Sequence, residues 1–217
     1  MHREGYTIVF GLVIAALILT LAYRLTDGGL GLRTSSVLLG ALAAFSAFFF
    51  RDPERQTPAG EGKVIAPADG RVIAIEEIEE PMFFGGKTKR ISIFLSVFNV
   101  HVNRAPVSGE VKLMKYQPGR FHVASLPAAS VENEQSIIGV DSPGGKVLFK
   151  QIAGLIARRI VCDLREGHRV QSGERFGIIK FGSRMEVYLP LSAEVKVRLR
   201  EKVRAGESII GELKNAK

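Results

Sequence analysis

Two long apolar runs open the chain, and a different pattern replaces them after residue 50. The first run, Gly5 to Tyr23, holds no charged residue, and neither does the second, Thr34 to Phe50. Each is close to the roughly 20 apolar residues that a helix needs to cross a bilayer. Between them, the glycine-rich segment 26–31 predicts a turn. The pattern predicts a membrane-anchoring helical hairpin over residues 1–50, with shallow insertion into the bilayer as its main variant.

The alternative for this region is a cleaved signal peptide followed by a core helix. No small-x-small cleavage site follows the first run cleanly, and a second apolar run argues against this alternative. A hairpin leaves both of its ends on one side of the membrane. The basic residues at those ends weakly favour a cell-membrane protein whose remaining chain lies on the cytoplasmic side. They are Arg3, Arg51, Arg55 and Lys63, against Arg24 and Arg33 in the turn.

After the hairpin, short β-rich runs alternate with turn signals. Residues 51–63 are polar and hold two prolines and two glycines, which predicts a linker. Residues 64–217 form the predicted β-rich domain, with strands at 72–75, 91–95, 147–149 and 186–189. The best helix candidate in this part, Gln151 to Leu164, fits a pair of strands about as well.

Two short patterns recur within the β-rich part. Segments 66–72 and 105–111 share A-P-x-x-G-x-V, and segments 170–174 and 203–207 share V-x-x-G-E. Similar turns before similar strands predict a mainly β, compact, barrel-sandwich-like domain with quasi-repeated halves, resembling biotinyl- and lipoyl-type folds. Coincidence between common Pro-Gly turns is the alternative, and a fold does not assign a function by itself.

Composition narrows the classes of function. Of the 217 residues, 46% are hydrophobic and 24% charged, which excludes a disordered chain. A single cysteine, Cys162, excludes an internal disulfide framework and a four-thiolate zinc site. The four histidines lack HxH or HxxxH spacing, so we expect no metal. The net charge of +8 suits a domain held against anionic lipids. No basic recognition pattern is visible, so we expect no nucleic-acid partner.

One Gly-Ser bond has a context that suggests chemistry. Gly182 and Ser183 lie between two strand-like runs, and glycine allows a backbone twist that other residues resist. A strained peptide with a hydroxyl beside its carbonyl is open to attack by that hydroxyl. Spacing alone favours an ordinary hairpin turn here, and the residues elsewhere in the chain change this interpretation.

Four separated motifs occur in a characteristic order. They are 49–55 (FFRDPER), 67–70 (PADG), 98–106 (FNVHVNRAP) and 181–184 (FGSR). Together they resemble the short-type phosphatidylserine decarboxylase proenzymes, and the resemblance covers essentially the whole chain, including the hairpin. Four motifs in the right order are far more specific than any one of them.

The resemblance implies a self-cleaving proenzyme of phospholipid biosynthesis, a lyase. Ser183 Oγ would attack the carbonyl of Gly182, and the chain would break between these two residues into a β chain, 1–182, and an α chain, 183–217, which stay together as a heterodimer. Position 183 would become a covalent pyruvoyl group, the only cofactor implied. Through a Schiff base at that position, the enzyme would convert phosphatidylserine in the membrane to phosphatidylethanolamine and carbon dioxide.

The resemblance also implies the groups that assist Ser183. A serine hydroxyl is a poor nucleophile without a base nearby, and His101 and Asp69 are the expected activating pair, by analogy with Ser-His-Asp sites. Each has a plainer alternative: a strand-end histidine bonded to backbone, and the turn residue of a Pro-x-Asp-Gly sequence. His101 is also the expected acid that protonates the product carbanion.

One departure concerns a histidine. Longer members of the family carry a second histidine three residues after the first, where this chain has Arg104. Either His101 serves both self-cleavage and decarboxylation, or His122 or a water takes one role. His122 and His168 are otherwise expected on the surface. Arg184 is a candidate for holding the lipid phosphate.

An apolar patch and two competing functions complete the expectations. Phe83 and Phe84, framed by turn residues, are predicted either to dip into the membrane interface beside the active site or to form a buried hairpin tip.

A membrane-tethered carrier or adaptor without catalysis is the alternative function. A lipoyl or biotinyl carrier needs a modifiable Lys beside Met, whereas Met185 has Arg184 and Glu186 as neighbours. A zinc peptidase would need the clustered ligands that this histidine spacing lacks.

Overall fold

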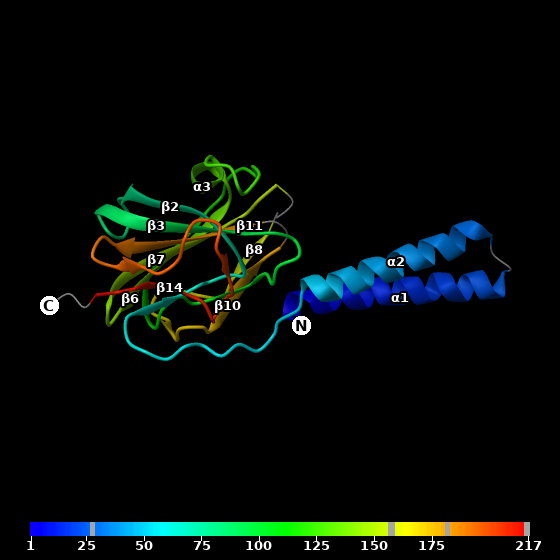
Figure 1. Cartoon of the computed structure of the whole chain (residues 1–217). Coiled ribbons are helices and arrows are strands. Elements are labelled where there is room, and N and C mark those ends of the chain that lie inside the picture. The colour runs from blue at the N-terminus through cyan, green and yellow to red at the C-terminus, as the bar shows by residue number, and fades with distance from the viewer. Residues whose placement is uncertain (27–28, 156–158, 181–182, 215–217) are drawn as a thin grey trace. The chain divides into compact units, whose positions relative to one another are not determined.

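The computed structural model describes residues 1–26, 29–155, 159–180 and 183–214, which form two compact units, 1–53 and 54–217 (Figure 1). The helices are α1 (Arg3–Leu25), α2 (Leu30–Phe49) and α3 (Ala129–Glu132). The strands are β1 (Lys63–Ile65), β2 (Gly70–Glu80), β3 (Gly86–Leu95), β4 (Val102–Arg104), β5 (Gly109–Gln117), β6 (Gln135–Ser142), β7 (Gly145–Ile152), β8 (Ile160–Cys162), β9 (Arg169–Val170), β10 (Arg175–Ile179), β11 (Ser183–Pro190), β12 (Glu194–Val195), β13 (Lys202–Val203) and β14 (Ile209–Glu212).

The first unit is the predicted pair of apolar helices. Both helices are long and apolar enough to cross a membrane, with mean hydropathies of 2.3 for α1 and 1.5 for α2 over 18-residue windows. The helices contact each other along their length, and Ser36 Oγ lies 2.5 Å from Thr20 Oγ1 and donates to the Ala16 carbonyl. Small residues allow such close approach between apolar helices. The predicted helical hairpin is therefore confirmed.

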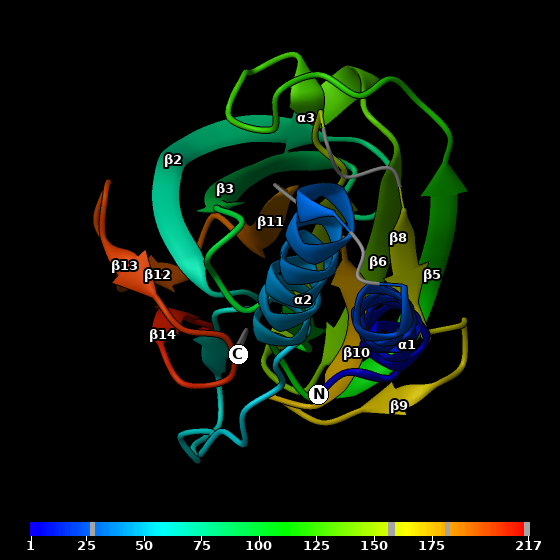
Figure 2. The ribbon, with the colours of Figure 1, turned by 90° about the vertical axis from the view of Figure 1, so that its right-hand side faces the viewer.

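The second unit is built on a strongly curled sheet (Figure 2). Its strand order is β13-β2-β3-β11-β7-β6-β5-β9, and every neighbouring pair is antiparallel. Along β11, Met185, Val187 and Leu189 point into the main hydrophobic core, so we call this face of the sheet the inner face. Two three-stranded sheets, β1-β14-β12 and β4-β10-β8, complete the domain. The predicted mainly β, barrel-like class is confirmed.

The A-P-x-x-G-x-V repeat corresponds to a repeated piece of structure. Gly70 begins β2 and pairs with Val203, and Gly109 begins β5 and pairs with Val170. A Cβ at Gly70 would lie 2.3 Å from the carbonyl oxygen of Phe94, and a Cβ at Gly109 would lie at the same distance from that of Asp141. In both strands, the pairing with the next strand shifts register directly after the valine of the repeat, which is Val72 in β2 and Val111 in β5. The repeats therefore mark equivalent strands, and only glycine fits where each strand crosses its neighbour.

The V-x-x-G-E repeat forms the turn that follows each edge strand. Gly173 and Gly206 both have positive φ, +81° and +76°, which side chains disfavour. Each glycine donates its N–H to the alanine carbonyl at the start of the other repeat, Gly173 to Ala105 and Gly206 to Ala66. The two sequence repeats are thus hydrogen-bonded to each other in each half of the domain.

Substituting one repeat glycine should destabilise the domain. We expect Gly109→Ala to lower the free energy of unfolding by roughly 1–3 kcal/mol, because the new methyl group would overlap the Asp141 carbonyl and force the strands apart. Thermal unfolding followed by circular dichroism measures this. Gly86→Ala is the matched control, since no atom lies within 4 Å of a Cβ there. Equal stability of the two variants would contradict the proposed crossing constraint.

Two local expectations can be compared with the structure, which also contains one short helix that we did not expect. Gln151 to Leu164 contains the end of β7 and all of β8, so the strand alternative is correct in the described part of this segment. The helix α3 was not anticipated, because four residues leave too short a periodic pattern. Phe83 and Phe84 pack against Ile137, Leu148 and Tyr188 on the outer face of the sheet.

The phenylalanine pair lies away from Ser183 along β3. Phe83 and Phe84 follow β2 at the end of β3 that begins with Gly86, whereas Ser183 pairs with Leu95 at the other end. At about 3.3 Å per residue, the path along β3 between these ends is about 30 Å long. The packing of the partly buried pair fits the hairpin-tip alternative, and a place in the membrane interface stays a prediction.

Candidate active site around Ser183

Ser183 lies at the start of a central strand. It is the first residue of β11, pairs with Leu95 of β3, and is fully buried. It points to the inner face, two residues before Met185. Its Oγ has no hydrogen-bond partner among the residues described. Buried hydroxyls normally find a partner, so an unpaired one is a feature that calls for a functional explanation. Gly182 lies outside the described residues.

His101 has the tautomer that a general base requires. Its side chain is fully buried just before β4, and Nδ1 lies 3.0 Å from the carbonyl oxygen of Asn99. A carbonyl oxygen can only accept, so Nδ1 carries the proton and Nε2 carries the lone pair in the neutral ring. The Asn99 side chain holds this turn, accepting from the Ser96 N–H and hydroxyl. The backbone-bonded alternative for His101 is thus realised at Nδ1.

Asp69 is held by an arginine from the first motif. Arg55 donates to both carboxylate oxygens, at 3.4 Å and 3.1 Å, and the Ala205 N–H donates to Oδ1 at 2.8 Å. Asp69 therefore has the expected turn role. It also lines a pocket of about 490 Å³ together with Ser96 and Asn99, the residues that position His101. Within the described part of the chain, the hydrogen bonds of the carboxylate go to Arg55 and Ala205 rather than to His101.

The four sequence motifs converge in the part of the chain described. Arg55 of the first motif binds Asp69 of the second, and the Pro67 carbonyl accepts from the Arg104 N–H of the third. The third motif follows directly from β3, the strand that pairs with Ser183 of the fourth motif. Residues more than a hundred positions apart are thereby brought to one end of the curled sheet.

Two buried amides, which the sequence did not single out, lie on the inner face near Ser183. Gln151 pairs with Met185 across β7 and β11, so its side chain faces the same interior as Ser183. Its Nε2 donates to Asn103 Oδ1 at 2.9 Å and to the Val161 carbonyl at 3.3 Å. Asn103 lies two residues after His101, and this i, i+2 spacing in a strand was the available signal that both share a face.

Arg184 is not placed to hold a lipid phosphate. Its side chain is 3% exposed on the outer face, with Nε 3.0 Å from Glu186 Oε1 and with a hydrogen bond to Ser92 Oγ. Burial lowers the pKa of its guanidinium, and the charge of Glu186 opposes this. The phosphate-binding expectation for Arg184 is therefore wrong, because its charge is already used inside the protein.

Glu186 is the centre of the buried polar network to which Arg184 belongs. Its carboxylate is fully buried and accepts from Ser130 Oγ at 2.8 Å and from Tyr188 Oη at 2.6 Å, with Arg90 Nη1 at 3.7 Å. The Arg184 side chain also donates to the Leu126 carbonyl. The network thus fastens segment 126–130 over the outer face of β3 and β11. In the sequence, the alternation of Arg184, Glu186 and Tyr188 resembles a solvent-facing strand edge, so this burial was not predictable.

The other candidate groups lie away from this assembly. His122 is 37% exposed and its Nε2 lies 3.0 Å from Glu132 Oε2, and His168 is also exposed. Burial raises the pKa of the Cys162 thiol to about 11, so it is a poor nucleophile at neutral pH. Within the described residues, no three His, Cys, Asp or Glu side chains are grouped so that they could hold a metal ion.

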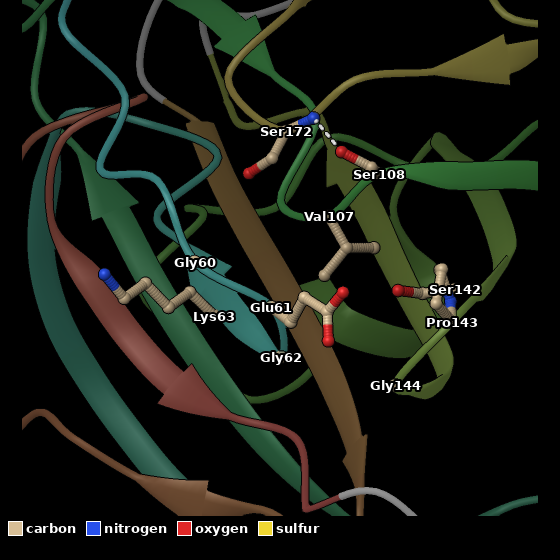
Figure 3. A pocket seen from close by; sticks show the side chains of 10 residues that line it. All are labelled: Gly60, Glu61, Gly62, Lys63, Val107, Ser108, Ser142, Pro143, Gly144 and Ser172. Atoms are coloured by element: carbon tan, nitrogen blue, oxygen red, sulfur yellow. Dashed lines mark hydrogen bonds between the residues drawn. The ribbon is translucent and has the colours of Figure 1, made fainter.

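Another pocket of the domain lies apart from the candidate site residues. Its volume is about 570 Å³, and the residues that line it include Lys63, Ser108 and Ser172 (Figure 3). The Ser172 N–H donates to Ser108 Oγ at 2.9 Å. None of its ten lining residues is Ser183, His101 or Asp69. Pocket size therefore does not identify the chemistry in this domain.

The fold and the site define a β-rich protein with two apolar N-terminal helices and a buried serine at the start of a central strand. A sequence model of the phosphatidylserine decarboxylase family matches residues 42–211. A Magnetococcus marinus protein named phosphatidylserine decarboxylase proenzyme is 50% identical over 178 residues, 82% of this chain and 82% of that protein. A Symbiobacterium thermophilum protein of the same name is 45% identical over 212 residues, 97% and 94% of the two chains.

The chain belongs to the phosphatidylserine decarboxylase family. The family predicted from the four motifs is thereby confirmed. The name of these relatives also describes them as proenzymes. The family name itself agrees with the expected place of this chain in phospholipid metabolism.

Proposed function

We propose that this protein decarboxylates phosphatidylserine to phosphatidylethanolamine and carbon dioxide, using a pyruvoyl group made from its own Ser183. The observation that carries the proposal is the buried, unpaired Oγ of Ser183 in a chain of this family. A serine that served only the fold would normally bond its hydroxyl to a neighbour. A serine that must attack its own backbone needs that hydroxyl available.

Self-cleavage requires a nucleophile and a base. Ser183 Oγ adds to the carbonyl carbon of residue 182, and its proton passes to a base. The Ser183 nitrogen leaves as an amine and an ester remains. A base then takes the Cα proton of residue 183 while the ester oxygen leaves Cβ, so the 1–182 chain is released as a carboxylate and a Cα–Cβ double bond remains. The resulting dehydroalanine tautomerises and is hydrolysed, releasing ammonia and leaving the pyruvoyl group at the start of chain 183–217.

His101 is the base that fits these steps. Its Nδ1 is bonded to the Asn99 carbonyl, so Nε2 is the atom that accepts a proton. Asp69 contributes a fixed negative charge in the adjoining pocket, held by Arg55 and the Ala205 N–H. A nearby carboxylate favours the imidazolium that forms when His101 takes the Ser183 proton. We therefore assign His101 as the base and Asp69 as its electrostatic support.

In the mature enzyme the pyruvoyl group supplies a ketone that binds the substrate amine covalently and an electron sink for the pair released with carbon dioxide. The protein must then return a proton to the substrate α-carbon, and we assign this to His101 Nε2. The buried setting of His101 and Ser183 excludes water from this step. Because Arg104 occupies the position where longer members of the family carry a second histidine, we assign both stages to His101 in this chain.

The substrate explains the two apolar helices. A diacyl lipid hardly leaves the bilayer, so the enzyme must work at its surface. The helices α1 and α2 would keep the β domain there, on the cytoplasmic side, and the net charge of +8 would favour contact with anionic head groups. The mature protein would consist of chains 1–182 and 183–217, held together by β11 pairing with β3 and β7.

Three measurements on the purified wild-type protein test this proposal. We expect a denaturing gel to show a large and a small fragment, and mass spectrometry to find a keto group in place of the amine at residue 183. We also expect liposomes containing phosphatidylserine to yield phosphatidylethanolamine. An active, intact polypeptide would disprove the mechanism. An intact and inactive polypeptide would favour the carrier or adaptor alternative.

A further inference from the structure

The pair of buried side-chain amides, Asn103 and Gln151, is incompletely hydrogen-bonded. Asn103 and Gln151 are both fully buried, and they bond to each other. Asn103 Nδ2 and Gln151 Oε1 have no hydrogen-bond partner within the described part of the chain. A buried polar atom without a partner costs about 1–3 kcal/mol, whereas an apolar pair of similar shape would cost nothing of the kind. The fold alone gives no reason to keep such a pair.

The orientation of both amides is determined by their contacts. The Gln151 side-chain nitrogen faces two oxygens, Asn103 Oδ1 and the Val161 carbonyl, so exchanging its nitrogen and oxygen would oppose oxygen to oxygen. Exchanging the two atoms of Asn103 instead would oppose two NH₂ groups. Gln151 therefore holds Asn103 with its Nδ2 donor directed away from the pair.

The free donor belongs to the interior that holds the reactive groups. Asn103 lies between Val102 and Arg104 in β4, Ala105 two residues later lies in the main core, and Asn103 bonds to the inward-facing Gln151, so Asn103 faces inward. Gln151 is opposite Met185, and Ser183 is its diagonal neighbour, roughly 7–8 Å away between Cα atoms and within reach of long side chains. β4 pairs with β10, with Asn103 opposite Gly177 and Val102 opposite Ile178. The chain before β4, where His101 lies, therefore follows β10 in the direction of Ile179, which is four residues before Ser183.

We propose that Asn103 is a further catalytic residue of self-cleavage, and that Gln151 positions it. When Ser183 Oγ bonds to the carbonyl carbon of residue 182 and its proton goes to His101, the carbonyl electron pair moves onto the oxygen. Asn103 Nδ2 donates a hydrogen bond to that oxyanion. When the carbon–nitrogen bond breaks, the oxygen returns to a carbonyl and the Ser183 nitrogen takes a proton from His101.

The chemistry of the donor set fits this role. The oxyanion forms on the carbonyl oxygen of residue 182, whose carbon is bonded to the nitrogen of the buried Ser183. The negative charge must therefore be stabilised by groups inside the protein. A neutral amide donor stabilises developing negative charge without competing with His101 for the serine proton. A preorganised donor of this kind contributes about 10²- to 10³-fold to the rate of acyl transfer. The inference rests on the proposed function, because it concerns the same bond.

The test is the rate of self-cleavage in freshly synthesised protein. Asn103→Asp keeps the shape of the side chain but replaces the donor by an acceptor, and Asn103→Ala removes the group. We expect both to cleave about 10²-fold or more slowly than the wild type, followed as fragment on a denaturing gel. Circular dichroism at the assay temperature establishes that each protein compared is folded. Where a variant is less stable, the assay temperature is lowered for all the proteins compared.

Hydroxylamine separates this role from a later one. It cleaves an ester once the ester has formed, so it would restore fragment release in a variant blocked only at elimination. We expect no rescue of Asn103→Asp, because the ester itself would form slowly. Rescue to the wild-type rate would overturn the oxyanion assignment. A folded Asn103→Asp protein that cleaves at the wild-type rate without hydroxylamine would overturn it as well.

Two further variants complete the design. Gln151→Met conserves volume but releases Asn103, and we expect slower cleavage. Thr88→Val removes another fully buried side-chain hydrogen bond, to the Ile78 carbonyl at the far end of β3, and should cleave normally. If the wild type does not cleave at residue 183, the proposed function fails. If the wild type cleaves and Asn103→Asp cleaves equally fast, only the present inference fails.

Discussion

Replacing Ser183 with alanine is expected to leave the protein as one uncleaved chain with no decarboxylase activity. Alanine lacks the oxygen that attacks the preceding carbonyl, and it cannot be converted to a pyruvoyl group. The Ser183 Oγ has no hydrogen-bond partner among the described residues, so its removal breaks no hydrogen bond there and should leave the fold intact. A denaturing gel measures the cleavage, and conversion of phosphatidylserine in liposomes measures the activity.

A second buried serine provides the control for this variant. Ser136 is 2% exposed and lies opposite Gln151, so it shares the inner face of the sheet with Ser183. We expect Ser136→Ala to be cleaved and to remain active, because Ser136 is not attached to the reacting bond. Cleavage of the Ser183→Ala protein between residues 182 and 183 would show that another group starts the reaction. Decarboxylation by that protein would reject the pyruvoyl mechanism.

Of the substitutions considered, replacing Glu186 with glutamine is expected to cause the largest fall in the free energy of unfolding. The substitution keeps the shape of the side chain but removes the negative charge between Arg184 and Arg90, at 3.0 Å and 3.7 Å. Arg184 is 3% exposed, so water cannot replace the lost partner. Breaking a buried ion pair on one side typically costs about 3–5 kcal/mol. For a protein of this size, that corresponds to a fall of roughly 10 °C in Tm.

The measurement should be made on uncleaved protein. With Ser183→Ala as the common background, Glu186→Gln changes stability without changing the number of chains. Glu110→Gln is the control, because Glu110 pairs with Lys112 on the surface, where both side chains are exposed, and we expect no measurable change in Tm. Equal Tm values for Glu186→Gln and the background would mean that the buried carboxylate does not stabilise the network.

The expectations for local structure were good where one physical signal dominates. Continuous apolar runs predicted α1 and α2, and the four strand runs all lie within observed strands, because β-branched residues between turn signals leave few alternatives. Pattern was ambiguous for Gln151 to Leu164, where periods of 2 and 3.6 fit equally well. The described part is strand, since β7 pairs with β6 and β11 on both sides and β8 with β10.

The candidate site was predictable only in part. The motif resemblance predicted the family and named Ser183, His101 and Asp69 as site residues, whose catalytic roles remain proposals. The partners of these residues were not predictable. Arg55 binds Asp69, and Gln151 binds Asn103, through contacts that span 14 and 48 positions in the chain. No periodicity links residues at such separations, because the contacts exist only once the strands have paired.

By itself, the sequence determined the elements and the family: the apolar helices, the short strands, the repeated glycine turns and the four ordered motifs. These depend on local preferences and on residue identity, which a linear chain displays directly. Only the tertiary structure decided which polar groups are buried and which face each strand presents to the core. It turned Arg184 from a ligand candidate into part of an internal ion pair, and Asn103 from a motif letter into an unpaired donor, because burial is a property of packing between distant strands.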